Sequence, residues 1–354
     1  MAKKKKVTKT GHKKFSKAKR CLLLTICIVV TVGVAAVVWG VIAAHSEFDQ
    51  ESSITLIIPQ ESTDAAIGDS LKTRLGDDFG PTVYRLWALR GGEPQKASGI
   101  YVVSPGDKAW SVAGRIKSGS SSPVRVTFNN IRLMSDLAER ISSKFLWSSD
   151  DFLKACDAVL PTYGFSYNQY PAAFIPDTYE FYASATPEEV VEKLVGYRNR
   201  FWTDERRMEA STLGLTPVEV ATLASIVEEE SNSPEERPVI ARLYLNRLDK
   251  GMKLQADPTV KYALGDFSIR RLYEKQLFTP SPYNTYYTNG LPPGPIRIPE
   301  ISTVKAVLNA PANDYIYMCA KPGGEGTHNF TSDYKEHLRN ARAYQSWLDS
   351  IKLQ

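Results

Sequence analysis

A run of three glutamates at residues 228–230 ends an apolar segment and offers carboxyl chemistry. Apolar residues at positions 220, 223, 224 and 227 have helical spacing, which predicts a helix with one buried face. At about 100° per residue, Glu230 lies beside the middle of that face, Glu228 at its margin, and Glu229 points away. Burial disfavours the charged form of a carboxyl group and raises its pKa toward the range that a general acid needs. Glu230 is therefore the candidate acid, and the alternative is that the three glutamates are only a solvated helix end.

Two helices are expected to position this acid. Thr216, followed by Pro217 and by Glu219 three residues on, forms a capping-box pattern and predicts the start of the first helix. The second helix begins either at a similar pattern in residues 233–236 or one turn later at Pro238, and it ends near Gly251. Either start leaves a short bend after Glu230, and the second helix leads into residues 255–259.

Beyond the two helices, a series of motifs runs along the chain: FIPDTY at 174–179, ASIVEEE at 224–230, NRLDKGMKLQADPTV at 246–260, PYNTY at 282–286, GLPPGPI at 290–296, YIY at 315–317 and GTHNF at 326–330. Together these motifs resemble those of the endolytic murein transglycosylases of the YceG-like family. Several linked motifs in one order are far more specific than a single pattern. The resemblance covers roughly residues 53–354, with departures at Ala256 and at residues 297–300 that concern loop shape more than catalysis.

This resemblance implies cleavage inside the glycan strand of peptidoglycan, between N-acetylmuramic acid and N-acetylglucosamine. Ordinary glycoside hydrolysis uses two carboxyl groups. A lytic transglycosylase needs one, because the 6-hydroxyl of the sugar closes a 1,6-anhydro ring, and Glu230 aligns with the catalytic glutamate of the family. The resemblance implies no cofactor, and it implies association with peptidoglycan synthases and termination of nascent strands. The alternatives are a muramidase that uses water and an inactive membrane-anchored glycan-binding or scaffold protein.

Other polar and aromatic residues of the motifs are candidates for binding and orienting sugar. Hydrogen bonds to substrate are expected from Glu228, Asn246, Gln255, Asp257 and Asn284, stacking on a sugar ring from Tyr283 or Tyr286, and a bond to substrate or to the acid from His328 in its Gly-rich loop. The structural alternatives are that Asp257 and Pro258 only form a turn and that Tyr286 belongs to the core.

The N-terminus predicts a single-pass membrane anchor. Residues 21–44 contain no charge, which is long enough to cross a hydrocarbon core of about 30 Å. Ten basic residues and no acidic ones precede this segment, so the positive-inside rule places the tail in the cytoplasm and the rest outside the cell (inner) membrane. A cleavable signal peptide is the alternative, but the apolar run is long and residues 42–44 make a poor cleavage site.

Composition excludes other function classes. Beyond the tail the chain has 34 Lys and Arg residues against 39 Asp and Glu residues, so its net charge there is mildly negative and nucleic-acid binding has no electrostatic basis. His328 and His337 lack the companions of a metal site, and nothing in the spacing of Cys156 and Cys319 requires them to pair.

The fold class expected is α+β, with four parts along the chain. These are a basic cytoplasmic tail at 1–20, a transmembrane helix at 21–44, a LysM-like module at 45–120 and a mixed α/β catalytic domain at 121–354. The module is expected to have strands at 53–59 and 99–103 and helices at 65–75 and 107–118. A strand at 124–128 and an amphipathic helix at 132–145 lead into the catalytic domain. The module either binds glycan or serves as a spacer.

Overall fold

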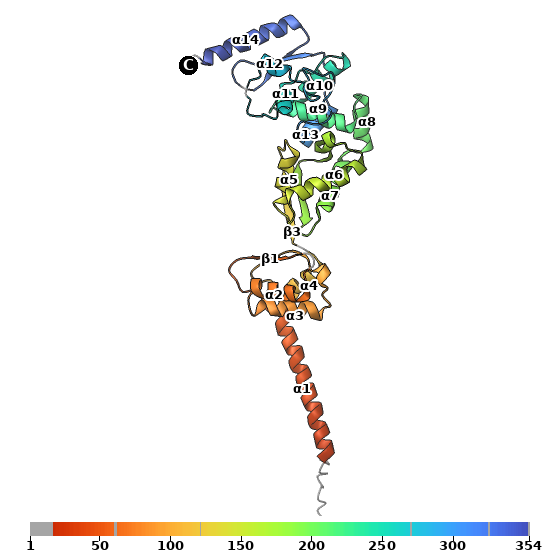
Figure 1. The fold of residues 1–354 in the computed structure, drawn as a ribbon, viewed down its shortest axis with the longest axis vertical. Helices are drawn as coiled ribbons and strands as arrows, with labels where there is room; N and C mark the ends of the chain where they lie inside the picture. Colours follow the sequence, from red (N-terminus) through yellow and green to blue (C-terminus); the bar gives the residue numbers. More distant parts are fainter. Residues whose placement is uncertain (1–16, 60–61, 121, 270, 325, 353–354) are drawn as a thin grey trace, which may run out of the picture. The chain divides into compact units, whose positions relative to one another are not determined.

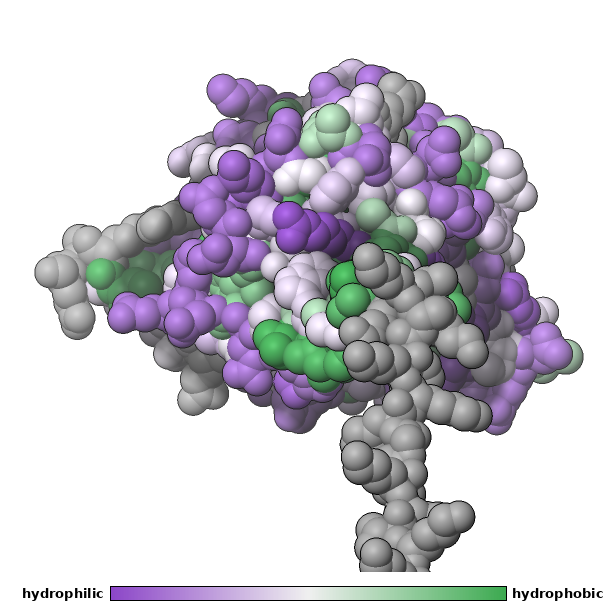
Figure 2. All heavy atoms as spheres, turned by 90° about the horizontal axis from the view of Figure 1, so that it is seen from below, coloured by the Kyte–Doolittle hydropathy of each residue, from purple (hydrophilic) through white to green (hydrophobic). Residues whose placement is uncertain are grey.

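The chain divides into two compact units, Met1–Ser122 and Pro123–Gln354. The computed structural model describes residues 17–59, 62–120, 122–269, 271–324 and 326–352 (Figure 1). Most of the predicted basic tail therefore lies outside the described residues. On the face seen in Figure 2, most side chains are hydrophilic and the hydrophobic ones lie in small patches.

The first unit begins with helix α1 (Lys17–His45), and its segment Leu24–His45 is long and apolar enough to cross a membrane. The apolar side chains of this segment are largely exposed. Because no other part of the described chain covers them, this helix fits the expected anchor.

A small module follows α1 in the same unit. Strand β1 (Ile54–Ile58) pairs antiparallel with β2 (Gly99–Val103), with Ile54 opposite Val103. Helices α2 (Asp64–Leu75), α3 (Phe79–Leu89) and α4 (Ala109–Ser118) and a 3-10 turn at Pro94–Lys96 complete the module around a core that contains Trp87 and Tyr101. The expected strands and two helices are confirmed, whereas α3 was not foreseen. The likeness to a LysM module stays a prediction.

The second unit contains two hydrophobic cores. The first core joins strands β3 (Pro123–Phe128) and β4 (Asp177–Tyr182), an antiparallel pair, to helices α5 (Met134–Ser142), α6 (Ser149–Val159) and α7 (Pro187–Phe201) and to 3-10 segments at Leu160–Tyr163 and Tyr167–Ala173. Helix α5 is shorter than the helix expected at 132–145. Its backbone at Leu133 is capped by the carboxylate of Asp136, so regular helix begins only at Met134.

The second core is built around helix α9 (Pro217–Glu230). Helices α8 (Asp204–Thr212), α10 (Arg237–Asp249), α11 (Asp257–Leu264) and α13 (Ile301–Leu308) pack against α9 (Figure 1). The chain also contains α12 (Glu274–Leu277), the antiparallel pair β5 (Tyr317–Ala320) and β6 (His328–Thr331), and α14 (Tyr334–Lys352), which packs on that pair. The mixed α/β character of this unit is thereby confirmed.

Helix α9 is buried all round and not along one face. Every residue from 220 to 228 is buried, including Thr222 and Ser225, whose hydroxyl groups donate to backbone carbonyls inside the helix. The expectation of a single buried stripe was therefore too narrow, because neighbouring helices cover α9 on several sides. Because packing on all sides holds α9 in place, the directions in which Glu228, Glu229 and Glu230 leave its C-terminal end are fixed.

Candidate active site

The ends of α9 are set by local sequence. The hydroxyl of Thr216 accepts from the backbone N–H of Glu219 at 3.3 Å, and the Glu219 carboxylate accepts from the N–H of Thr216 at 2.7 Å. This confirms the predicted capping box. The helix ends at Glu230 because Ser231 is extended, with φ −142° and ψ 135°. Helix α10 begins at Arg237 with Pro238 in its first turn, which confirms the later of the two expected starts.

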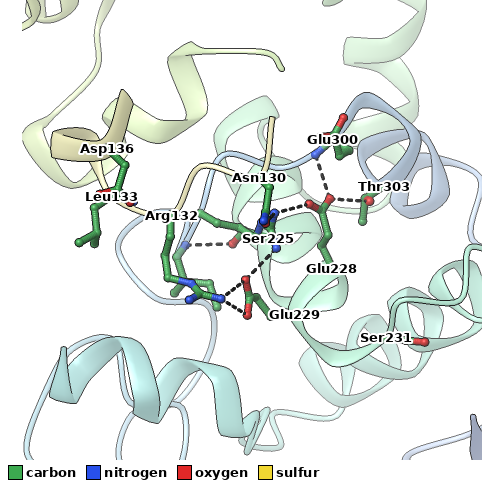
Figure 3. A network of polar contacts seen from close by, with 12 residues as sticks. Asn130, Arg132, Leu133, Asp136, Ser225, Glu228, Glu229, Ser231, Glu300 and Thr303 are labelled. Carbon is green, nitrogen blue, oxygen red and sulfur yellow. Dashed lines mark hydrogen bonds and ion pairs between the residues drawn. The ribbon is translucent and has the colours of Figure 1, made fainter. Parts of the chain in front are cut away.

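The first of the three glutamates, Glu228, is held inside the protein. Its Oε1 lies 3.1 Å from Nη2 of Arg297, and its Oε2 accepts from the N–H of Glu300 at 2.9 Å and the hydroxyl of Thr303 at 2.7 Å (Figure 3). Only 5% of Glu228 is exposed. Both oxygens are occupied by partners within the chain, which gives Glu228 an internal role, and sugar binding by this residue stays a prediction.

Glu229 does not point away from the protein, as the helical wheel had suggested. Nη2 of Arg132 lies 2.8 Å from both of its oxygens, and Nη1 of Arg297 donates to Oε1 at 2.8 Å (Figure 3). Arg297 also donates to the side chain of Asn130 at 2.6 Å. Two arginines thus neutralise the first two glutamates and link the end of α9 to the segment that follows β3.

Glu230 has a different environment from its two neighbours. Its Oε1 accepts a hydrogen bond of 2.7 Å from the hydroxyl of the buried Tyr244, and part of its surface stays accessible to solvent. Burial raises the pKa of Glu230 to about 7, against the hydrogen bond from Tyr244, which lowers it. The negative charge of Asp257 raises this pKa further, whereas Lys261 and Arg247 lower it. The predicted elevation of the pKa by burial is confirmed.

Two of the expected sugar-binding residues, Asp257 and Tyr286, interact electrostatically with Glu230, and a third, Gln255, contacts Arg247. Asp257, the first residue of α11, is exposed and accepts from the hydroxyl of Tyr286 at 2.7 Å. Gln255 is also exposed, and its Oε1 lies 3.5 Å from Nη1 of Arg247. Its backbone is in the left-handed region with φ 52°, a conformation that few side-chain-bearing residues adopt. Asp257 and the half-buried Tyr286 thus lie near enough to interact electrostatically with Glu230, whereas Gln255 is exposed and contacts Arg247.

The two asparagines serve the interior. The amide of Asn246 donates to the carbonyls of Asn313 and Tyr315 at 3.0 and 2.9 Å. Asn284 is 0% exposed, and its amide donates to the carbonyls of Leu277 and Thr279 at 2.9 and 2.8 Å. Backbone carbonyls already occupy both amides, so the structure gives both residues an internal role, and their contacts with substrate stay a prediction.

His328 lies in strand β6 and not in the Gly-rich loop before it. Its Nδ1 lies 3.0 Å from Oε2 of Glu236, and its backbone N–H donates to Oε1 of the same residue at 2.7 Å. The histidine does contact an acid, but this acid caps α10 and is not the candidate Glu230. His328 therefore ties β6 to the start of α10.

Tyr283 belongs to a group of aromatic residues that line a cavity. Its ring centroid is 4.7 Å from that of Tyr262, and both rings line a cavity of about 280 Å³ together with Tyr167 and Met134. Tyr262 also lines a smaller cavity of about 90 Å³ with Lys261, one of the residues whose charge acts on Glu230. Tyr262 thus lines both cavities, and the smaller one is also lined by Glu229, the residue before the candidate acid.

Sequence reasoning missed several residues of this site. They are Arg132, Tyr167, Tyr244, Arg247, Lys261, Tyr262 and Arg297. A signal existed for Lys261, which stands four residues after Asp257 and so on the same face of α11. Among the described residues, no group of three or more His, Cys, Asp or Glu residues could hold a metal ion. The described cysteines Cys156 and Cys319 are both free thiols.

Comparisons with known proteins agree with this architecture. Residues 56–343 match the model of the YceG-like family, and the chain belongs to that family. A protein from Listeria monocytogenes described as YceG-like has a crystal structure with a TM-score of 0.52 and 25% identity, covering 82% of this chain and 99% of that one.

Two curated relatives carry the name endolytic murein transglycosylase. The protein from Bacillus subtilis (strain 168) is 38% identical over 171 residues, which are 48% of this chain and 47% of that protein. The protein from Streptococcus pneumoniae (strain ATCC BAA-255 / R6) is 30% identical over 172 residues, 47% of this chain and 30% of that protein. The chain therefore matches about half the length of these relatives, or less.

Proposed function

We propose that this chain is an endolytic lytic transglycosylase that cuts peptidoglycan between N-acetylmuramic acid and N-acetylglucosamine, with Glu230 as its acid and base. The observation that carries the proposal is the partly buried carboxyl group of Glu230, which accepts a hydrogen bond from Tyr244 and whose pKa is raised to about 7. At neutral pH a large share of such a group is protonated and can donate a proton. The names of the two bacterial relatives support the same reaction.

The proposed reaction needs one carboxyl group in two roles. Protonated Glu230 donates its proton to the bridging oxygen as the bond from that oxygen to the anomeric carbon breaks. The 6-hydroxyl of the same N-acetylmuramic acid attacks the anomeric carbon, and its proton passes to the Glu230 carboxylate. A 1,6-anhydro end and a free 4-hydroxyl result, the acid is regenerated, and no water is consumed.

Hydrolysis is the second candidate, and Asp257 is the observation that favours it. Glu228 and Glu229 are ion-paired with arginines. Asp257 is exposed, and its negative charge raises the pKa of Glu230. A second carboxylate beside an acid is what a hydrolytic muramidase requires to activate water. In the lytic reaction Asp257 has only a binding role, so the two candidates differ in what loss of Asp257 does.

The substrate strand is proposed to run past Glu230 along the tyrosine-lined cavities. Tyr167, Tyr262 and Tyr283 offer ring faces for stacking on pyranose rings, and Gln255 and Asp257 offer hydrogen-bonding groups. Such alternation of flat apolar faces and a few polar groups is typical of carbohydrate sites.

The location of the reaction is also a proposal. Helix α1 anchors the chain in the cell membrane with the basic N-terminus in the cytoplasm and the catalytic unit outside. The LysM-like module either binds glycan or acts as a spacer between α1 and the catalytic unit. By resemblance to the family, the enzyme acts with peptidoglycan synthases and terminates nascent strands.

Digestion of purified sacculi tests the proposal. Mass spectrometry of the products distinguishes 1,6-anhydro ends, reducing ends and no cleavage, for the wild type, Glu230→Gln and Asp257→Asn. We expect anhydro ends from the wild type, a loss of at least about 100-fold in Glu230→Gln and a smaller loss in Asp257→Asn. Reducing ends from the wild type would establish the muramidase, and intact sacculi would favour an inactive glycan-binding protein.

A further inference from the structure

The C-terminal end of α1 and the module after it enclose a groove that the proposed reaction does not use. The groove has a volume of about 640 Å³ and lies between α1, α3 and α4. Its apolar lining consists of Val37, Val41, Ala44, Leu86, Leu89 and Trp110. We define these six residues as the α1 groove.

Backbone hydrogen bonds hold the walls of the α1 groove together. The N–H of Phe48 donates to the carbonyl of Asp107, and the N–H of Ala109 donates to the carbonyl of Ser46, both at 2.9 Å. The chain that leaves α1 is thereby fixed to the start of α4. The groove is therefore a built feature of the first unit and not a gap between loosely joined segments.

The groove combines uncovered apolar surface with cations. Leu89 is 75% exposed and Trp110 49% exposed, and because both line one groove they form a contiguous apolar surface that the described chain does not cover. The guanidinium carbon of Arg90 lies 4.1 Å from the ring centroid of Trp110, and Lys108 lines the same groove. Within the described ranges, neither Arg90 nor Lys108 forms an ion pair with a carboxylate.

We propose that the α1 groove binds one anionic phospholipid from the membrane leaflet at the C-terminal end of α1. The inference rests on the proposed anchor, because the groove is continuous with the apolar segment that ends at His45. An acyl chain lies along Val37 and Val41 against Leu89, and the phosphate meets Arg90 and Lys108. A tryptophan beside cations at the end of a membrane helix is the arrangement that suits the headgroup region. The bound lipid holds the module against the membrane surface.

Binding of one lipid in the α1 groove differs from the nonspecific attraction of basic residues to an anionic membrane surface. A polybasic segment attracts lipid headgroups without selecting an acyl chain, whereas this site joins an open apolar wall to two cations that have no carboxylate partner within the described ranges. The guanidinium of Arg90 is held in place by a hydrogen bond of 2.8 Å to the carbonyl of Trp110. Retention of a single lipid on the isolated protein is therefore the expected signature, with a preference for an anionic headgroup.

The experiment uses the full chain in nanodiscs of equal phosphatidylcholine and phosphatidylglycerol, followed by mild detergent extraction and native mass spectrometry. Co-elution of the chain with the discs tests the anchor separately. We expect one phosphatidylglycerol per chain, and about fivefold less retention in Lys108→Gln, the factor that one lysine near an anionic surface contributes. Lys117→Gln removes the same charge from the other end of α4 and keeps full retention. Leu89→Glu loses retention of both lipids.

Equal retention of the two lipids by the wild type, or equal effects of Lys108→Gln and Lys117→Gln, would overturn the proposal. So would retention of a polyprenyl-linked glycan in place of phospholipid when both are supplied. Failure of the chain to enter the discs would overturn both the anchor and the lipid site. None of these results depends on cleavage of peptidoglycan, so they leave the proposed reaction untouched.

Discussion

Replacing Tyr244 with phenylalanine tests how the protein tunes Glu230. The Tyr244 hydroxyl donates to Oε1 of Glu230 at 2.7 Å and lowers the pKa of Glu230, which burial has raised to about 7. A hydrogen bond to a charged group contributes roughly 1.5–3 kcal/mol, and about 1.4 kcal/mol corresponds to one pKa unit. Water at the accessible part of Glu230 replaces some of the lost bond, so we expect the variant to raise the pKa by about one unit, to about 8.

The assay measures kcat/KM for soluble glycan strands between pH 5 and 9, because the pH dependence of kcat/KM reports the pKa values of groups in the free enzyme. Because the acid must be protonated, activity of the wild type falls with a midpoint near the pKa of Glu230, about 7. The Tyr244→Phe midpoint moves to about 8. Tyr286→Phe is the matched control, since its hydroxyl bonds to Asp257 and not to Glu230, and its midpoint stays with the wild type. An unmoved or lower midpoint in Tyr244→Phe, or equal movement in both variants, would refute the reasoning.

Three further predictions concern stability. Because burial raises the pKa of Glu230 from 4.5 to about 7, ionisation costs the folded state up to about 3 kcal/mol, a loss that develops as pH rises through this window. Urea unfolding should show Glu230→Gln gaining stability over the wild type at pH 8 and little at pH 4. Arg297→Leu leaves Glu228 buried without its cation and should cost about 3–5 kcal/mol. Arg125→Leu, which breaks an exposed pair, should cost under about 1 kcal/mol, and equal losses would contradict the burial argument. Asn284→Ala removes a fully buried amide and leaves the partly buried carbonyls of Leu277 and Thr279 without this partner, so it should cost about 1–3 kcal/mol in thermal or urea unfolding, and a neutral effect would contradict its assigned role.

The elements that sequence could predict are those with local determinants. The capping box at Thr216 depends on residues three positions apart, and each strand of the first unit depends on the apolar pattern within its own five residues. Helix α3 escaped prediction because Gly80 and Pro81 at its start are typical of a turn. The structure gives the reason for Gly80: a Cβ there would collide with the backbone of Leu71 in α2. That requirement comes from helix packing, which the sequence does not display.

In the candidate site, too, the features set by local sequence were predictable and the contacts between distant residues were not. The period of α9 and the apolar residues before Glu230 were enough to predict a buried acid with a raised pKa. The partners of Glu228 and Glu229 were not predictable, because Arg132 lies 97 residues before Glu229 and Arg297 lies 68 after it. The motifs suggested that Asn246 and Asn284 contact substrate. In the structure their side-chain amides donate to backbone carbonyls, and those carbonyls come within hydrogen-bonding distance only when the loops are folded.

The proposed chemistry depends on Glu230 staying protonated well above the pH at which an ordinary glutamate ionises. Infrared difference spectra between the wild type and Glu230→Gln, recorded from pH 4 to 9, isolate the C=O stretch of this one protonated carboxyl group. The account predicts a band that disappears with a midpoint near pH 7. A band that is already lost at pH 5, as for an ordinary exposed glutamate, would contradict it.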